Sequence, residues 1–210
     1  PGTTILIDDR ITNSPITNKK FYGLTWAFKQ GYEHVAAIDC DTLFIKSVDI
    51  YEKFQEYTKN HTIFSSLTKD KYCHRINRKC SEWFSEEEQK KLKEITRNFE
   101  EYFWFNQIPI YEKETFDNFS QRFNLTKLAD ILTYQDLDYI IYGYYCLLNG
   151  WNLKTLSDGT SFVSERWGLI ENGKDLQISD LKHALESMKS FWSPIRIDCE
   201  NVFMLLHTDR

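Results

Sequence analysis

The chain has 210 residues, of which 41% are hydrophobic and 27% are charged, a balance typical of a soluble globular protein. This length suits one domain with a substantial core, so we expect a single domain across residues 1–210. The formal net charge of −5, without any Arg-rich run, argues against nucleic acid as the main partner.

The first part of the chain predicts two strands and one helix. Thr3 to Ile7 is a short β-rich run that predicts a buried strand. Residues 18–30 carry apolar side chains near helical spacing, and Gly31 is a typical residue at a helix end. His34 to Ile38 is a continuous apolar run that predicts a strand, and a second apolar run follows at residues 43–45.

The middle of the chain predicts further elements and one long loop. A helix and a strand are expected at residues 49–59 and 61–67. The basic patch from Lys69 to Lys79 is short and mixed, which predicts a solvated loop, with an acceptor or membrane-surface role as the alternative. The stretch from Lys69 to Ser85 is the best candidate for a flexible, functional loop. Ser85 and Glu88 have the spacing of a capping box, which predicts a charged helix from Ser85 to about Glu101.

The remainder of the chain continues the alternation of strands and helices. Strands are expected near residues 108–111, 153–156 and 201–206, and helices near residues 113–123, 135–149 and 179–190. Because strands alternate with helices, the sequence predicts an α/β fold with a mainly parallel sheet flanked by helices.

The five cysteines, at residues 40, 73, 80, 146 and 199, form no Cys-x-x-Cys pair. The sequence therefore lacks the pattern of a zinc or thioredoxin-like motif. Cys40 and Cys146 lie in apolar runs, and we expect packed thiols there. Cys73 and Cys80 would bridge the predicted loop only in an oxidising compartment.

The most informative segment is Asp39-Cys40-Asp41, which follows the apolar run at residues 34–38. Its two carboxylates lie at the C-terminal end of a predicted strand, where ligands bind in open α/β sheets. Carboxylate oxygens suit a divalent ion such as Mg²⁺ or Mn²⁺, with coordination positions left for a diphosphate. The alternative is that both residues are only turn chemistry at a strand end.

The stretch from Phe21 to Ile45 resembles the approach to the Asp-x-Asp motif of GT-A glycosyltransferases. Later segments resemble glycosyltransferase family 8 in the same order. They are Phe105-Asn106 with Ile108 to Tyr111, Lys113 to Phe119, Tyr134 to Tyr139, Trp151-Asn152 and Leu206-His207. The resemblance implies a GT-A, Rossmann-like fold and transfer of a sugar from a nucleotide-sugar donor, with a UDP-sugar as the first expectation.

The resemblance also implies a metal site made by three residues. Asp41 would coordinate Mn²⁺ or Mg²⁺ directly, and Asp39 would hold either the metal or the ribose of the donor. His207 would be the third protein ligand, as a neutral imidazole. The alternative for His207 is a surface histidine near the end of the chain.

Other residues would contact the substrates. By resemblance, Asn106 lies beside the donor sugar, Gln135 lies near the anomeric carbon, and Asp136 hydrogen-bonds sugar hydroxyls. Gln135 and Asp136 are therefore the expected catalytic residues. Lys20 would reach a donor phosphate, and Asp138 is a second candidate contact. The competing interpretation is N-terminal helix chemistry for Gln135 and Asp136, and solvated positions for Lys20 and Asp138.

Two functions are open on this basis. The first is a metal-dependent glycosyltransferase that acts on a glycan or other acceptor hydroxyl with retention; with inversion, Asp136 or Asp138 would be the base. The second is a catalytically silent GT-A-like module that binds a glycan or a partner.

The N-terminal part and the composition give two more expectations. Only 38 residues precede Asp39, so we expect either a fragment or an abbreviated donor pocket. The composition favours a bacterial, cytoplasmic enzyme with peripheral membrane association, and the Golgi lumen is the alternative.

Overall fold

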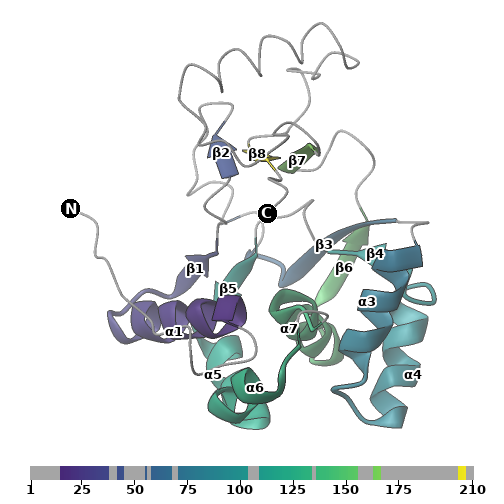
Figure 1. Ribbon diagram of the computed structural model, residues 1–210, viewed down its shortest axis with the longest axis horizontal. Helices are drawn as coiled ribbons and strands as arrows, with labels where there is room; N and C mark the ends of the chain where they lie inside the picture. Colours follow the sequence, from purple (N-terminus) through teal and green to yellow (C-terminus); the bar gives the residue numbers. More distant parts are fainter. Residues whose placement is uncertain are drawn as a thin grey trace, which may run out of the picture. The chain divides into compact units, whose positions relative to one another are not determined.

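The computed structural model describes residues 15–37, 42–44, 55, 58–67, 71–103, 109–133, 136–155, 163–166 and 203–206. They form a mixed α/β structure of helices and small sheets (Figure 1). Contacts within the chain divide it into two compact units. The first unit contains residues 1–37, 50–104 and 109–155, and the second contains residues 38–49, 105–108 and 156–210. Because the two units are interleaved along the chain, a single domain over residues 1–210 stays a prediction.

The first unit contains two small sheets. In one, β1 (His34–Ala36) pairs antiparallel with β5 (Ile110–Glu112). In the other, β3 (Thr62–Leu67) lies between two strands. β6 (Asn152–Thr155) runs parallel to it, and β4 (Glu101–Tyr102) runs antiparallel. Strands far apart in the sequence are therefore joined in each sheet.

The second unit contains one described sheet of three strands. β8 (Phe203–Leu206) is the central strand. It pairs antiparallel with β2 (Thr42–Phe44) and parallel with β7 (Val163–Arg166). Among the strand pairs that the structure describes in the whole chain, three are antiparallel and two are parallel. The prediction of a mainly parallel sheet is therefore not met in this part of the chain.

Six helices are described in the first unit. They are α1 (Pro15–Lys29), α3 (Lys71–Ser81), α4 (Glu86–Ile95), α5 (Lys113–Phe123), α6 (Leu125–Ile131) and α7 (Asp138–Leu148). α7 is buried at its first residue and throughout residues 140–147. A helix that is apolar around most of its circumference belongs in the interior of a unit, and α7 has this position.

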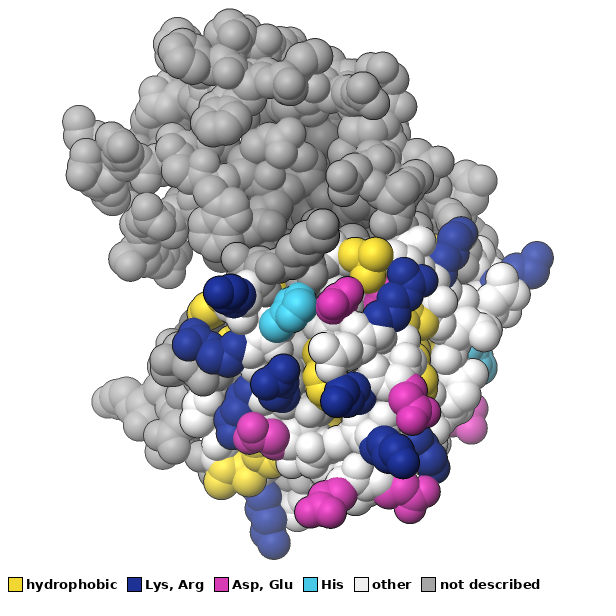
Figure 2. Space-filling model, turned by 90° about the vertical axis from the view of Figure 1, so that its right-hand side faces the viewer, with side chains coloured by type: hydrophobic (Ala, Val, Ile, Leu, Met, Phe, Trp, Pro, Cys, Tyr) yellow, Lys and Arg dark blue, Asp and Glu magenta, His cyan; other side chains and the backbone are white. Residues whose placement is uncertain are grey.

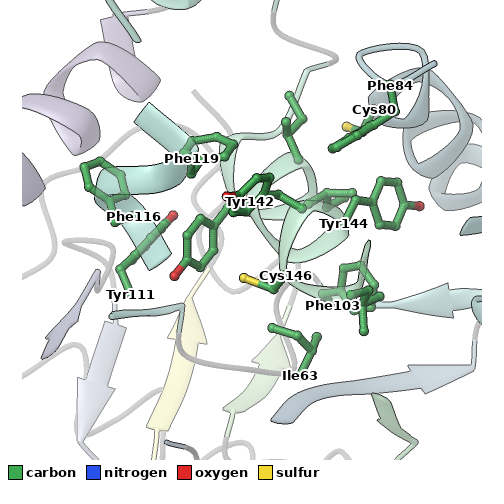
Figure 3. Close-up of a cluster of buried hydrophobic side chains, with 14 of the residues drawn as sticks. Ile63, Cys80, Phe84, Phe103, Tyr111, Phe116, Phe119, Tyr142, Tyr144 and Cys146 are labelled. Atoms are coloured by element: carbon green, nitrogen blue, oxygen red, sulfur yellow. The ribbon is translucent and has the colours of Figure 1, made fainter. Parts of the chain in front are cut away.

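The hydrophobic core of the first unit surrounds α7 (Figure 3). Phe116 and Phe119 from α5 approach Tyr142 on α7, with ring centroids 6.4 Å and 5.5 Å from its ring. Tyr111 from β5 approaches the same ring at 4.6 Å. Tyr144, two residues further along α7, meets Phe103 edge to face at 5.7 Å. Many of the described aromatic side chains thus pack around one central helix.

Local sequence signals located several elements correctly. α1 ends at Lys29, and Gly31 has a φ of 93°, the left-handed conformation expected of a glycine at a helix end. The helix predicted at residues 113–123 is α5. At the start of α4, the Ser85 hydroxyl and the Glu88 carboxylate make both bonds of the predicted capping box.

The prediction of a flexible loop from Lys69 to Ser85 is wrong, because residues 71–81 form α3. The buried side of α3 uses Ile76, Asn77 and Cys80. An apolar stripe with only one aliphatic residue is weak in the sequence, and the basic residues around it indicated a solvated loop instead. Cys73 and Cys80 form no disulfide among the described residues, so the bridged loop is not found either.

The predicted extent of the α4 helix is also corrected. It ends at Ile95, well before Glu101. Arg97, Asn98 and Phe99 have φ values of 50°, 61° and 67°, which a right-handed helix does not contain. The Thr96 hydroxyl completes the end by donating to the Leu92 carbonyl at 2.7 Å.

Three predicted elements lie outside the described residues. They are the strand at residues 3–7, most of the helix at residues 49–59, and the helix at residues 179–190.

Candidate functional site

The strands of the second unit lead to the first group of predicted site residues. β2 and β8 are antiparallel, and Thr42 pairs with Leu205. The start of β2 and the end of β8 therefore lie at the same end of the strand pair. Asp39 and Asp41 precede β2, and His207 follows β8 directly. These three residues lie outside the described residues, as do Asn106 and Gln135.

The second group of predicted residues lies at the start of α7. Asp136 is only 3% exposed. Its Oδ1 accepts a hydrogen bond from the Trp83 indole N–H at 2.9 Å. Its Oδ2 accepts from the Thr133 backbone N–H at 2.8 Å and from the Thr133 hydroxyl at 2.7 Å. Both carboxylate oxygens thus have donors within the protein, which is what a buried carboxylate requires.

The Cys80 thiol of α3 contacts the same helix start. The Leu137 N–H donates to Cys80 Sγ at 3.4 Å. Burial, opposed by this hydrogen bond and assisted by the Asp136 charge, raises the pKa of the Cys80 thiol to about 12. The thiol is therefore protonated at neutral pH and acts as a packing and hydrogen-bonding group rather than as a nucleophile.

Asp138 is the first residue of α7 and is 5% exposed, so the interpretation of a solvated Asp138 is wrong. The Tyr111 hydroxyl donates to its Oδ2 at 3.0 Å. Lys20 Nζ lies 4.0 Å from its Oδ1. Burial, with the Asp138 charge as the next cause, raises the pKa of Tyr111 well above 10, so the phenol remains the donor. The first turn of a helix also favours a negative charge through the helix dipole.

The structure thus brings Lys20 of α1 and Asp138 of α7 together across 118 residues of sequence. Asp136 has different partners, because Trp83 and Thr133 donate hydrogen bonds to its carboxylate oxygens. Beyond Thr133, the described hydrogen-bond partners of these two carboxylates, Tyr111 and Trp83, lie more than 25 positions away in the sequence. No local pattern in the sequence indicates such partners.

Another polar cluster, around Glu112, was missed by sequence reasoning. Its Oε1 lies 3.9 Å from His34 Nε2 and 3.6 Å from His61 Nε2, and each contact becomes an ion pair when the imidazole is protonated. The His61 ring also stacks on Trp151 with centroids 5.0 Å apart. Glu112 and Trp151 line a small pocket whose other lining residues are Thr58, Thr62, Ile63, Ile110 and Tyr139. The members come from β1, β3, β5 and α7 and from the segments just before β3 and β6, so spacing in the sequence gave no signal.

A buried glutamate joins the three-stranded sheet of the first unit. Glu101 of β4 is 0% exposed. The Ser65 hydroxyl donates to its Oε2, the Thr155 hydroxyl donates to its Oε1 at 2.8 Å, and Arg97 Nε lies 3.2 Å from Oε1. This network connects β3, β4 and β6, so we interpret Glu101 as a structural residue of the sheet.

Among the described residues, no group of three or more His, Cys, Asp and Glu side chains is arranged to hold a metal ion. The predicted ligands Asp39, Asp41 and His207 are outside that part of the chain, so the metal site stays a prediction. In the described parts, no helix combines the length and the apolar character needed to cross a membrane.

Comparisons with models of protein families, with curated proteins and with solved structures find no match for this chain.

Proposed function

We propose that the chain is a metal-dependent glycosyltransferase of the GT-A type. It would transfer a sugar from a nucleotide-sugar donor, in the first place a UDP-sugar, to a hydroxyl of a glycan acceptor. The observation that carries the proposal is the antiparallel pairing of β2 with β8. The start of β2 and the end of β8 lie at the same end of this pair. In the sequence, Asp41 directly precedes β2 and His207 directly follows β8.

The dimensions of paired strands support a shared ion at this place. Asp41 precedes Thr42 and His207 follows Leu206, and consecutive Cα atoms are about 3.8 Å apart. Facing residues of antiparallel strands have Cα atoms about 4.5–5.5 Å apart. At strand ends this close, two carboxylates and one imidazole would be able to share one ion. This donor set suits Mn²⁺, whereas Mg²⁺ prefers oxygen ligands alone.

The ion would neutralise a diphosphate leaving group, which favours cleavage of the bond between sugar and diphosphate. We assign Asp41 and His207 to the metal, and Asp39 to the metal or the ribose. Asn106 would contact the donor sugar, and Gln135 would lie near the anomeric carbon in a reaction with retention.

Lys20 and Asp138 enter the proposal as a pair. Asp138 is buried and accepts the Tyr111 hydroxyl, so it is poorly suited to contact a sugar or to act as a base. Its second oxygen lies 4.0 Å from Lys20 Nζ, and the Lys20 side chain is 25% exposed. We therefore assign Asp138 the role of positioning Lys20, whose ammonium would bind a donor phosphate.

A second candidate function is a catalytically silent GT-A-like module that binds a glycan or a partner. The observation in its favour is the state of Asp136. A carboxylate that hydrogen-bonds sugar hydroxyls needs accessible oxygens, whereas Trp83 and Thr133 occupy both oxygens of this buried side chain. If Asp136 is only structural, one of the two expected catalytic residues is lost.

The test is calorimetric titration of UDP into the full chain, with and without Mn²⁺. We expect Mn²⁺ to increase the affinity for UDP. Asp41→Asn or His207→Ala should reduce this increase in affinity by more than about tenfold. The matched control is Asp117→Asn, which removes a carboxylate that pairs with Lys113 on the surface of α5. Binding of UDP that does not depend on Mn²⁺, or no binding of UDP, contradicts the proposal.

A transfer assay then separates the two candidate functions. The full chain is incubated with UDP-hexoses, Mn²⁺ and a panel of oligosaccharides, and released UDP and extended glycan are measured. Release of UDP coupled to glycan extension supports the transferase. Metal-dependent UDP binding without any turnover supports the silent module.

A further inference from the structure

Helix α3 concentrates positive charge in a protein that is acidic as a whole. Its eleven residues contain no Asp or Glu, and its basic residues are Lys71, His74, Arg75, Arg78 and Lys79. The formal net charge of the chain is −5. Segregation of one sign of charge onto a single helix creates a local field that attracts a partner of opposite charge.

Three of these cations, Lys71, Arg75 and Arg78, form what we call the α3 basic row. They are spaced by four and then three residues, which places them on one side of the helix. All three are exposed, whereas Ile76 and Asn77 on the other side are buried. At 1.5 Å per residue the row is about 10 Å long.

The basic row is not neutralised by neighbours in the described part of the chain. There, no carboxylate forms an ion pair with Lys71, Arg75 or Arg78, whereas Lys79 on the same helix lies 2.6 Å from Glu82. Instead, the Arg75 guanidinium lies 5.1 Å from the ring centroid of Tyr72. The Tyr72 side chain is 44% exposed, so the row combines cations with an accessible aromatic ring.

The next helix shows that this is not a general property of the surface. α4 contains four Glu and three Lys residues, and its Lys91 lies 3.1 Å from Glu87. Figure 2 likewise shows basic and acidic side chains intermixed on the face it presents, with most of the acidic ones toward its lower edge. The mixed helix α4 therefore offers a matched comparison for α3.

We propose that the α3 basic row docks the protein on an anionic lipid surface. A straight row on a convex helix fits a flat surface with many phosphates, and an adjacent tyrosine suits the headgroup region, where aromatic rings with a polar group are enriched. Leu67, which is 51% exposed, precedes α3 by four residues and adds an accessible apolar side chain. This inference does not depend on the proposed glycosyltransferase activity.

Co-sedimentation of the full chain with vesicles tests the inference. We expect binding to phosphatidylcholine vesicles that contain phosphatidylglycerol and none to pure phosphatidylcholine. Each cation near an anionic surface contributes about fivefold in affinity, so the variant Lys71→Gln/Arg75→Gln/Arg78→Gln should lose about a hundredfold. The control variant Lys90→Gln/Lys91→Gln/Lys93→Gln, with the same change in net charge on α4, should keep its vesicle binding.

Three outcomes overturn the inference. They are no binding of the wild type to anionic vesicles, an equal loss of binding in the α3 and α4 variants, and preferential binding of a duplex oligonucleotide that the α3 variant abolishes. The last outcome would assign the row to nucleic acid instead. Thermal melting followed by circular dichroism checks that each variant is folded, and single substitutions at the same exposed positions replace any triple variant that is not.

Discussion

The middle and the start of α7 are both buried, but by different means. Around Tyr142 the burial is by other rings, among them Phe116 and Phe119. Around Asp136 and Asp138 it is by hydrogen-bond donors, namely Trp83, Thr133 and Tyr111. Stability in the middle is distributed over many weak contacts and falls with the volume removed. Stability at the start depends on a few donors, each of which leaves a buried carboxylate under-satisfied when it is lost.

This difference bears on the proposed active site. A helix start whose carboxylates are held by internal donors is poorly suited to contact ligands directly. The proposal of a bound metal ion therefore rests on one end of the β2 and β8 pair. Asp39 and Asp41 precede β2 in the sequence, and His207 follows β8.

The largest effect is expected in the ring cluster that surrounds the middle of α7, to which Phe119 of α5 belongs. Phe119 is fully buried, and its ring lies 5.0 Å from Phe123 and 5.5 Å from Tyr142 and Tyr145. Phe119→Ala should lower the free energy of unfolding by about 3–5 kcal/mol, through lost burial and a residual cavity. Urea denaturation measures the change. The control is Tyr22→Ala, since Tyr22 is 53% exposed and should change stability by less than about 0.5 kcal/mol.

A loss of less than about 1 kcal/mol for Phe119→Ala would be at odds with a tightly packed ring cluster. It would mean that the core around α7 can collapse into the space left by the ring, and the contrast with the helix start would disappear.

An intermediate effect is expected at the start of α7. Tyr111→Phe keeps the ring packing and removes the hydroxyl that donates to Asp138 Oδ2 at 3.0 Å. We expect a loss of about 1.5–3 kcal/mol in the free energy of unfolding, because this donor serves a buried charge. The control is Tyr32→Phe, the same chemical change on a side chain that is 59% exposed.

A double-mutant cycle with Asp138→Asn separates the Tyr111–Asp138 interaction from other effects. Coupling close to zero would show that the hydroxyl and the carboxylate do not stabilise each other, and hydrogen-bond donors would then not be what stabilises the start of α7.

The same contrast explains how far the sequence could be interpreted. Features that depend on residues close together in the sequence could be predicted. They include the capping box of Ser85 and Glu88 and the glycine after α1. α3 was missed because its buried side includes Asn77, whose amide donates to the carbonyls of Phe99 and Glu101 at 2.9 Å and 2.8 Å. Those partners lie more than 20 residues away, so an apolar period could not reveal the helix.

The candidate site divides in the same way. The Asp39-Cys40-Asp41 run could be singled out because two carboxylates follow one apolar strand. The surroundings of Asp138 could not be predicted, since its contacts come from Lys20 and Tyr111 on other elements. A sequence identifies a chemically unusual segment, whereas the donors that satisfy a buried carboxylate become visible only in the fold.

The smallest effect is expected at the start of α4, which is exposed. Its first turn contains the carboxylate of Glu88, as the start of α7 contains the buried carboxylates. Arg122 donates to Glu88 Oε2 at 2.8 Å, and this bond, followed in effect by the bonds from Ser85, lowers the Glu88 pKa from 4.5 to about 2. Glu88→Gln keeps an N3 residue suited to the capping box and removes the charge. At pH 7 the loss should be at most about 1 kcal/mol, because the pair is partly exposed and screened by solvent.

The pH dependence of that loss has a definite sign. A carboxylate whose pKa is lower in the folded state stabilises the protein above its unfolded pKa and loses this contribution as the pH falls. The difference in stability between the wild type and Glu88→Gln should therefore be constant above pH 4.5 and shrink as the pH falls toward 2. Urea denaturation at a series of pH values measures it, with Glu87→Gln, which removes an exposed pair with Lys91, as the control. A difference that persists undiminished near pH 2 would show that the charge of Glu88 is not the source of the stabilisation, and the ion pair with Arg122 would then have no measurable effect on stability.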